Sequence, residues 1–310
     1  MGTGFHIVVP GNSLTDQAFA SLEVELPVLL HRLDRELFST YSPTSELSLV
    51  NQARSGIATP VSQQLLDVLS AAQEVHTQSA GNFDITVKAL VDLWGFGSLE
   101  AVQDIPDADN IAKARSMTGM NKFTVNPDLG IVTKQAQVAL DLSAIAKGYA
   151  IDQVATLLDA KGLNHYLVEI GGEVIQKGVK APGLQWQVGI ELPDAGGQTL
   201  FQAIAAGSDK TGIATSGNYR NFFIHEGQRY SHVIDPATGW PVNHNLVSVT
   251  VVADSAMQAD AWATALLVEG LEEGMARANA LQLAAYFITS QNNGFHTRYS
   301  EAFNQYLLTP

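Results

Sequence analysis

The sequence predicts a mixed α and β protein, because helical and strand patterns follow one another along its 310 residues. Residues 62–75 repeat apolar side chains at the spacing of an amphipathic helix, behind a serine in the N-cap position. Residues 255–269 are almost continuously apolar, which is typical of a buried helix. Residues 230–234 instead alternate as a strand does, and Asp235-Pro236 ends that strand with a turn. These patterns indicate the class of fold and leave its topology open.

The composition is that of an ordinary globular protein with an acidic surface. Apolar residues make up 46% of the chain, and the formal net charge is −14. Such a charge argues against nucleic acid and anionic lipid as partners, since both carry phosphate. There is no cysteine, which excludes disulfides, thiolate metal sites and cysteine nucleophiles. We therefore expect any polyphosphate ligand to arrive with a metal ion that supplies positive charge.

The first half of the chain begins with a predicted strand at residues 5–9 and a helix at 15–38. Pro27 is expected to break or kink that helix, because proline lacks the N–H that the preceding turn needs. A hydroxyl-rich loop at 39–43 is typical of helix capping. After the helix at 62–75, the pattern predicts a helix at 108–117 and strands at 122–125, 131–134 and 138–142.

The second half begins with a helix that runs to Gly162 and has Ser143 as its expected N-cap. Residues 214–220 are interpreted as a loop before a hairpin that turns at Glu226-Gly227. The dinucleotide-binding pattern G-x-G-x-x-G is absent from the sequence. Besides the helix at 255–269, strands are expected at 165–170, 185–192, 200–205, 220–225, 247–252, 283–288 and 294–299.

One histidine stands at a position that suits a catalytic group. His232 lies near the end of the strand at 230–234, three residues before Asp235. A strand fixes the backbone, and a turn opens space in front of it. A single histidine in an alternating strand is more often a packed or hydrogen-bonded structural residue, so the pattern by itself is weak evidence for catalysis.

Three further positions place polar groups where a ligand is a reasonable partner. Asp84 lies between two apolar residues, where a helix cap and a ligand contact are equally good interpretations. Lys147 follows a strand-to-helix junction, and the N-terminus of a helix suits an anion or a ligand hydroxyl. Asp260 and Thr264 lie one turn apart on an otherwise apolar helix, so their shared face has little reason to meet water.

Eight short motifs follow one another through almost the whole chain. They are Met1-Gly2-Thr3, residues 39–51, residues 82–87 with 93–97, Asp141 to Asp152, residues 169–172, Thr215 to Arg220, Ser231 to Pro236, and Ala259-Asp260 through Thr264. Each motif is weak alone, but all eight in this order resemble the ApbE family of flavin transferases. These enzymes use FAD to attach FMN to a Ser or Thr of other flavoproteins.

The resemblance implies an α+β fold, with residues 1–310 as a single compact unit of two intertwined lobes and FAD in a cleft between them. In the family, an Asp and a Thr of one helix and a backbone carbonyl hold a divalent ion, normally magnesium (Mg2+). The corresponding residues here are Asp260, Thr264 and Ala144, all of them oxygen donors as a hard cation requires. Positions that correspond to FAD contacts are Met1, Tyr41, Asn82, Phe83, Asp84, Asp141, Lys147 and Thr215.

The implied reaction consumes FAD as a substrate. A Thr or Ser hydroxyl of an acceptor protein attacks the FMN-side phosphorus, and AMP leaves. His232 is the expected general base, since an imidazole with an ordinary pKa of ~6.5 is well matched to neutral pH. Asp235 is expected to hold the turn. The implied partner is an acceptor flavoprotein, such as a subunit of a membrane redox pump.

Two other functions stay open at this point. The first is a metal-dependent FAD pyrophosphatase, in which water replaces the protein hydroxyl. The second is a flavin-binding protein without catalysis, which has no need of His232, Asp260 and Thr264 together. The resemblance also implies a lipoprotein of the bacterial periplasm, held at the inner membrane in its full-length form. Residues 1–20 as given carry no signal-peptide pattern, and we expect no transmembrane span.

Overall fold

The computed structural model describes residues 3–11, 14–97, 104–193, 199–291 and 294–308, and divides the chain into two units. Each unit is assembled from segments that are separate in sequence, so the chain passes between the units four times, after His31, Ala144, Tyr219 and His244. The predicted mixture of α and β structure and the predicted interleaving of two lobes are confirmed. Unit 1 comprises Met1–His31, Ile145–Tyr219 and Asn245–Pro310, and unit 2 comprises Arg32–Ala144 and Arg220–His244.

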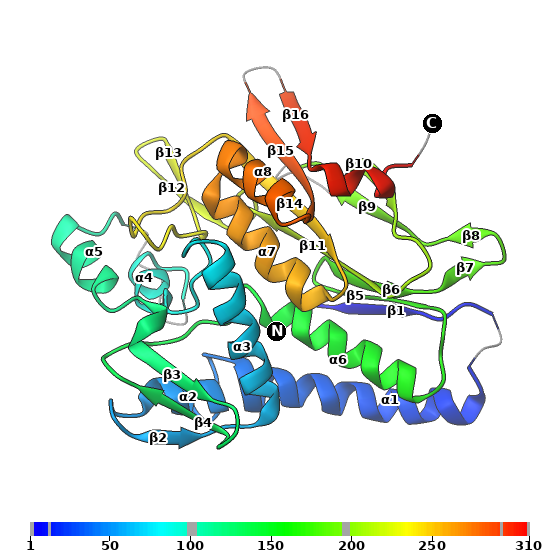
Figure 1. The fold of residues 1–310 in the computed structure, drawn as a ribbon, viewed down its shortest axis with the longest axis horizontal. Helices are drawn as coiled ribbons and strands as arrows, with labels where there is room; N and C mark the ends of the chain where they lie inside the picture. Colours follow the sequence, from blue (N-terminus) through cyan, green and yellow to red (C-terminus); the bar gives the residue numbers. More distant parts are fainter. Residues whose placement is uncertain (1–2, 12–13, 98–103, 194–198, 292–293, 309–310) are drawn as a thin grey trace. The chain divides into compact units, whose positions relative to one another are not determined.

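Unit 1 is built on a seven-stranded sheet whose neighbouring strands are all antiparallel (Figure 1). β14 is buried along nearly its whole length, because other parts of unit 1 cover both faces of the sheet there. In spatial order the strands are β1 (Phe5–Val8), β5 (Tyr166–Ile170), β6 (Glu173–Lys177), β11 (Thr211–Gly217), β14 (Leu246–Ala253), β15 (Ala284–Gln291) and β16 (Gly294–Tyr299).

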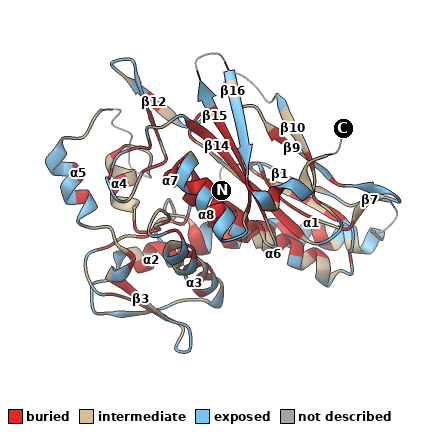
Figure 2. Cartoon of the chain, turned by 45° about the horizontal axis from the view of Figure 1, so that its top comes forward, coloured by how far each residue is buried: buried red, intermediate tan, exposed pale blue. Residues whose placement is uncertain are grey.

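Helices cover one face of this sheet. α6 and α7 pack against each other, α6 also contacts β5 and β6, and α7 contacts β11 and β14. Figure 2 shows α7 and β14 as largely buried. The core on this side joins apolar residues of α1 and α6 to those of β5. The helices of unit 1 are α1 (Asp16–His31), α6 (Ala146–Ala160), α7 (Ala256–Glu269) and α8 (Leu271–Ala280).

The other face of the sheet is covered by a small hairpin and a C-terminal helix. Val174, Ile213 and Tyr286 project to this side and pack with Ile204 of the hairpin and with Phe303. This second core explains why the central strands are apolar on both faces. The elements here are β9 (Gln187–Glu191), β10 (Leu200–Ala205) and the 3-10 helix η3 (Glu301–Tyr306), with the separate pair β7 (Val179–Ala181) and β8 (Leu184–Gln185) beyond them.

The N-terminus of α7 approaches two neighbouring elements unusually closely. A Cβ atom on Gly148 of α6 would lie 2.3 Å from the backbone oxygen of Ala256. A Cβ atom on Gly212 of β11 would lie 2.3 Å from the backbone nitrogen of Ala256. Only glycine leaves room for backbone at these distances. The two glycines therefore fix where α7 begins.

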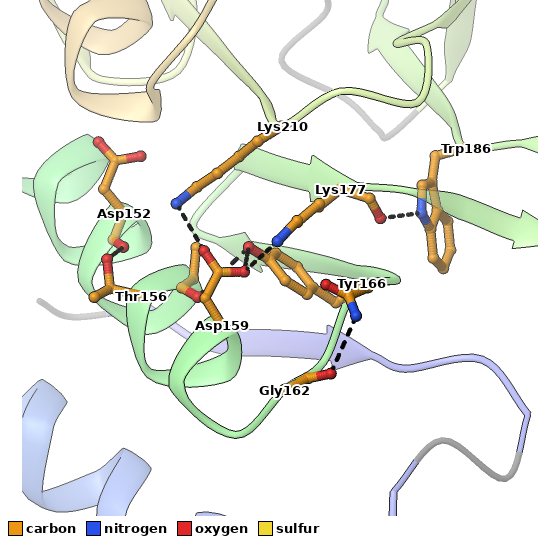
Figure 3. Close-up of polar contacts among 10 residues, drawn as sticks. Asp152, Thr156, Asp159, Gly162, Tyr166, Lys177, Trp186 and Lys210 are labelled. Carbon is orange, nitrogen blue, oxygen red and sulfur yellow. Dashed lines mark hydrogen bonds and ion pairs between the residues drawn. The ribbon is translucent and has the colours of Figure 1, made fainter.

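Two acidic side chains of α6 bind neighbouring elements. The Asp152 carboxylate accepts the backbone N–H groups of Ala256 and Met257, each over 2.9 Å, and so satisfies N–H groups in the first turn of α7. Near the end of the helix, Asp159 accepts hydrogen bonds from Tyr166 of β5 and Lys177 of β6, both over 2.9 Å (Figure 3). Burial opposes ionisation of Asp159, but these hydrogen bonds, with one from Lys210, lower its pKa.

Unit 2 consists of short helices and small sheets and has its own aromatic core. The Trp94 indole N–H donates to the Gly239 carbonyl over 2.8 Å, and the ring stacks on Tyr230 and lies close to Phe223. Its elements are the π-helix η1 (Arg32–Phe38), α2 (Glu46–Gln52), α3 (Gln63–Gln78), α4 (Lys88–Leu93), α5 (Ala108–Arg115), the 3-10 helix η2 (Met120–Lys122), the sheet β2 (Ala58–Pro60), β4 (Ile131–Lys134) and β3 (Phe123–Asn126), and the hairpin β12 (Phe222–His225) and β13 (Gln228–Ser231).

Most predicted elements are confirmed, and some differ. Helix α1 runs through Pro27, so the proline does not break it, and the change to a π-helix comes later, at Arg32. Residues 138–142 form no strand. Leu140 pairs there with the side-chain amide of Asn51, which accepts from its N–H over 2.7 Å and donates to its carbonyl over 2.9 Å, as a strand neighbour would. Residues 211–217, in part predicted as a loop, form strand β11. No helix within the described ranges has the length and hydropathy needed to cross a membrane.

Candidate functional site

Unit 1 brings together three of the residues singled out from the sequence. The Lys147 ammonium, in the first turn of α6, lies 3.6 Å from Asp260 Oδ1 on α7. Asp260 Oδ2 accepts the backbone N–H of Gly148 over 3.1 Å. Thr264 lies one turn further along the same helix. The prediction that Asp260 does not face open solvent is confirmed, since its exposed fraction is 3%.

A fourth charged residue belongs to this cluster and was not identified from the sequence. Glu173, at the start of β6, accepts a hydrogen bond from Lys147 Nζ over 2.6 Å and is 5% exposed. Two glycines with positive φ, Gly171 (66°) and Gly172 (103°), form the turn that places it there. The only sequence signal was that Gly-Gly pair, which indicates an unusual backbone but not the direction of the side chain that follows.

Burial and neighbouring charges act in opposite directions on the ionisable groups of this cluster. Burial by itself lowers the pKa of Lys147, but the nearby carboxylates of Asp260 and Glu173 outweigh it and raise that pKa, so the ammonium stays charged. Burial raises the pKa of Glu173 to about 7, and the nearby Lys147 charge offsets only part of that increase. One ammonium therefore lies beside two buried carboxyl groups.

Thr264 is held from β11. Its hydroxyl lies 2.8 Å from the hydroxyl of Ser216. Thr215, the residue chosen from the sequence, makes a different contact, because successive side chains of a strand point to opposite faces. Its hydroxyl lies 2.8 Å from that of Thr250 on β14. The loop expected to begin at Thr215 is part of a strand, and Ser216 is the residue of that strand whose hydroxyl contacts Thr264.

The donor chemistry of this cluster fits a hard divalent cation. Asp260 supplies a carboxylate and Thr264 a hydroxyl, both of them oxygen ligands. Glu173 Oε2 is buried and has no hydrogen-bond partner among the described residues. No group of three or more histidine and acidic side chains that could hold a metal ion occurs among the residues described. Any cation at Asp260 would therefore need further ligands from a carbonyl, water or a bound phosphate.

His232 lies in unit 2, directly after the end of β13. Its Nδ1 lies 3.0 Å from the Asn221 carbonyl, and a carbonyl only accepts hydrogen bonds, so Nδ1 carries the proton. The ring nitrogen Nε2 is then the basic one. The Phe96 ring lies edge-on to the imidazole, with 6.3 Å between ring centroids. One contact with the backbone thus fixes both the orientation and the tautomer of His232.

Asp235 holds the turn that follows, as predicted. Its two carboxylate oxygens accept hydrogen bonds from the Ala237 N–H and the Thr238 hydroxyl, each over 2.8 Å. Its own backbone N–H donates to the Trp240 carbonyl over 2.9 Å. Both carboxylate oxygens are thus engaged in the turn, which leaves His232 as the stronger candidate for the base in this segment.

Asp84 and Asp141 lie close together in unit 2, because the backbone N–H of Asp141 donates to the Ile85 carbonyl over 2.7 Å. Asp84 Oδ1 accepts the N–H of Thr86 over 2.7 Å and shapes the turn before α4 without being its N-cap. Asp141 Oδ1 accepts the N–H of Ser143 over 2.8 Å. Ser143 is therefore not the helix cap that the sequence suggests; α6 begins at Ala146 with no side-chain cap.

The remaining predicted contacts differ in how accessible they are. Tyr41 is 65% exposed, and its hydroxyl donates to the Gly97 carbonyl over 3.3 Å. Phe83 is 2% exposed, and Asn82 next to it donates its side-chain amide to the Ser79 carbonyl over 3.0 Å. Ala144 is the last residue of its segment in unit 2. Met1 lies outside the described residues.

Comparisons with known proteins point in one direction. The sequence model described as the ApbE family matches residues 1–287. A Vibrio cholerae protein named FAD:protein FMN transferase is 38% identical over 308 residues, covering 99% of this chain and 90% of its own. The Escherichia coli K12 protein of the same name is 36% identical over 312 residues, covering 100% and 88%. The structure of the flavin transferase ApbE from Vibrio cholerae superposes with a TM-score of 0.89 at 37% identity, covering 99% of this chain and 96% of that one.

Proposed function

The chain belongs to the ApbE family, as its motifs predict, and from this premise we propose that it is an FAD:protein FMN transferase. The family, the mixed fold and the transferase class were all expected from the sequence. The observation that carries the proposal for this chain is the imidazole of His232, which the Asn221 carbonyl holds in the tautomer that a general base requires.

In the proposed reaction, the oxygen of an acceptor Ser or Thr hydroxyl forms a bond to the FMN-side phosphorus of FAD. The bond from that phosphorus to the bridging oxygen breaks, and AMP leaves with the electron pair. His232 Nε2 accepts the hydroxyl proton, while its Nδ1–H stays hydrogen-bonded to Asn221. The Asn221 bond stabilises the resulting imidazolium, because a carbonyl oxygen carries partial negative charge.

We propose that unit 1 supplies the cation ligands Asp260 and Thr264 and that the Ala144 carbonyl completes the protein's share, with magnesium (Mg2+) as the ion. The ion would offset the negative charge of the FAD diphosphate and of the leaving group. Ser216 orients the Thr264 hydroxyl through its 2.8 Å contact. Lys147 holds a permanent positive charge beside Asp260, suited to a phosphate oxygen.

The proposed FAD contacts in unit 2 divide into two kinds. Tyr41 exposes an aromatic ring that suits a flat flavin or adenine ring. Asn82, Asp84 and Asp141 offer polar atoms beside turns, suited to ligand hydroxyls or the adenine amine. Since the Phe83 side chain is buried, its part in binding would be to hold this segment in place. Met1 and Thr215 remain proposals from the resemblance alone.

Mass spectrometry of an acceptor flavoprotein after incubation with this protein, FAD and Mg2+ tests the function. We expect the acceptor to gain the mass of one FMN on a Ser or Thr, with release of AMP in equal amount. A parallel reaction without acceptor measures hydrolysis of FAD by water. An unmodified acceptor with full conversion of FAD to FMN and AMP would instead identify a pyrophosphatase.

We further propose that the full-length protein is a lipoprotein of the bacterial periplasm and that its acceptor is a subunit of a membrane redox pump. The support is the family resemblance. Fractionation of cells that express the full-length gene, followed by detection of flavin fluorescence in separated membrane proteins, tests both points. Fractionation into the cytoplasm would contradict the location, and a fluorescent band that is unchanged after gene deletion would contradict the acceptor.

A further inference from the structure

The Lys147 ammonium lies closer to one of its two neighbouring carboxylates than to the other. Its Nζ is 2.6 Å from Glu173 Oε1 and 3.6 Å from Asp260 Oδ1. The first distance is a short charge-assisted hydrogen bond, and the second is an ion pair without one. In the structure Lys147 is therefore bound to Glu173 and only neighbours Asp260.

The second oxygen of Glu173 gives that residue capacity to hold the ammonium more tightly. Glu173 Oε2 is buried and makes no hydrogen bond with the described protein atoms. A buried carboxylate oxygen without a partner is costly, since burial removes the water that would solvate it. If Nζ moves away from Asp260, it can approach both oxygens of Glu173.

The arrangement matters for the cation that we propose at Asp260. An ammonium and a divalent cation that share one carboxylate repel each other strongly in a partly buried site. Turning Asp260 away would break the hydrogen bond that its Oδ2 accepts from the Gly148 N–H on α6. Movement of Lys147 breaks no such bond, and Glu173 is the neighbouring carboxylate to which its ammonium is already hydrogen-bonded.

We propose that Glu173 is a positioning residue that draws Lys147 off Asp260 and thereby sets the affinity of Asp260 for a divalent cation. The inference rests on the proposed cation site and adds to it a residue that acts through Lys147 instead of binding the ion. Without Glu173, Asp260 is the remaining ion-pair partner of the ammonium among the described residues, and the ammonium competes with the cation. With Glu173 in place, the Lys147 ammonium stays charged and near Asp260 but does not compete with the divalent cation for the Asp260 carboxylate.

Titration with Mn²⁺ alone, followed by electron paramagnetic resonance of the free ion, measures this affinity without turnover or FAD. Glu173→Gln keeps the shape of the side chain and removes its charge, and we expect its affinity to fall about tenfold or more, as a change of one nearby unit charge in a partly screened site predicts. Lys147→Met should bind at least as tightly as the wild type, because the competing ammonium is gone. The double variant decides the mechanism.

If Glu173 acts through Lys147, Glu173→Gln has no effect once Lys147 is gone, so the double variant Glu173→Gln/Lys147→Met binds Mn²⁺ as tightly as Lys147→Met. A double variant about tenfold weaker than Lys147→Met would show that Glu173 acts on the ion directly, and would overturn the inference. Wild-type affinity in Glu173→Gln would overturn it as well. Glu173→Asp, which keeps the charge on a shorter side chain, should lie between Glu173→Gln and the wild type.

Asp260→Asn separates this test from that of the proposed function. Mn²⁺ affinity that Asp260→Asn leaves unchanged would overturn the cation site itself, and the role of Glu173 with it. Binding that depends on Asp260 but is indifferent to Glu173 would overturn only the positioning role. Thermal unfolding of each variant confirms its fold, and if Glu173→Gln does not fold, a loss of Mn²⁺ affinity in Lys147→Met overturns the inference.

Discussion

The backbone N–H of Gly148 donates a hydrogen bond to the carboxylate of Asp260 over 3.1 Å, although the two residues lie 112 positions apart in the chain. This bond joins α6 to α7 where the two helices approach closely, since a Cβ atom on Gly148 would lie 2.3 Å from the Ala256 oxygen. The absence of a side chain at position 148 thus decides where the Asp260 carboxylate is held.

Gly148→Ala should destabilise the protein and weaken binding at Asp260 together. The added methyl group has no space, so α6 and α7 must separate, at a cost of about 1–3 kcal/mol in the free energy of unfolding. Chemical denaturation measures the loss. Gly4→Ala is the matched control, since nothing lies within 4 Å of a Cβ atom there. Equal stability of both variants would show that the helices tolerate the methyl group.

His232→Ala should bind FAD with the affinity of the wild type but transfer FMN about 10²- to 10⁴-fold more slowly, the usual cost of losing a general base. Stopped assays of acceptor modification and equilibrium titration with FAD measure the two quantities separately. His225→Ala, on β12 of the hairpin that precedes His232, controls for the loss of an imidazole from this part of unit 2. A transfer rate near that of the wild type would require another base.

Asp260→Ala should raise the Mg2+ concentration needed for turnover more than Thr264→Val does. The carboxylate is the only full charge among the proposed ligands, so its removal takes away most of the attraction for a divalent cation. Initial rates over a range of Mg2+ concentrations give both values, and a chelator should abolish transfer by the wild type. Unimpaired turnover of Asp260→Ala at limiting Mg2+ would contradict the assignment.

Tyr41 and Phe83 should respond to alanine in opposite ways. Tyr41 is 65% exposed, so Tyr41→Ala should leave the free energy of unfolding nearly unchanged and weaken FAD binding roughly tenfold, as expected for loss of an aromatic platform. Phe83 is 2% exposed, so Phe83→Ala should cost about 3–5 kcal/mol of stability. Titration calorimetry with FAD measures the binding affinity of both variants, and chemical denaturation measures their free energy of unfolding. A loss of stability in Tyr41→Ala but not in Phe83→Ala would contradict the prediction.

Asp152 should make stability depend on pH. Burial raises its pKa from 3.8 to about 6, against the opposing effect of the Met257 and Ala256 N–H groups. Because the folded form then binds a proton more tightly than the unfolded chain, the contribution of Asp152 to stability falls as the pH rises from about 4 to about 6 and is constant above that range.

Asp152→Asn removes this titration. The difference in unfolding free energy between Asp152→Asn and the wild type should shift in favour of the variant by up to about 3 kcal/mol between pH 4 and pH 7. Denaturant titrations at several pH values measure it. Asp159→Asn serves as the control at the other end of α6, where hydrogen bonds lower the carboxyl pKa and the dependence has the opposite sign. Parallel curves for Asp152→Asn and the wild type would contradict the expectation.

The sequence by itself determined the elements whose signal is local. The helix at 62–75 was predicted with its N-cap, and Ser62 does accept the Leu65 N–H. The buried helix that carries Asp260 was predicted because an apolar segment of that length can satisfy its backbone within itself. The eight motifs likewise identified the family, since residue types at fixed spacing are properties of the chain alone.

Only the tertiary structure decided which residues meet across long separations. Lys147 and Glu173 lie 26 positions apart, Ser216 and Thr264 lie 48 apart, and Asn51 takes the place of a strand beside Leu140 from 89 positions away. Local periodicity cannot predict such contacts, because side-chain direction and strand pairing depend on how separate segments pack. The sequence therefore predicted the residue types of the site. The hydrogen-bond and ion-pair partners of those residues were decided by the packing of α6, β6 and β11 around α7.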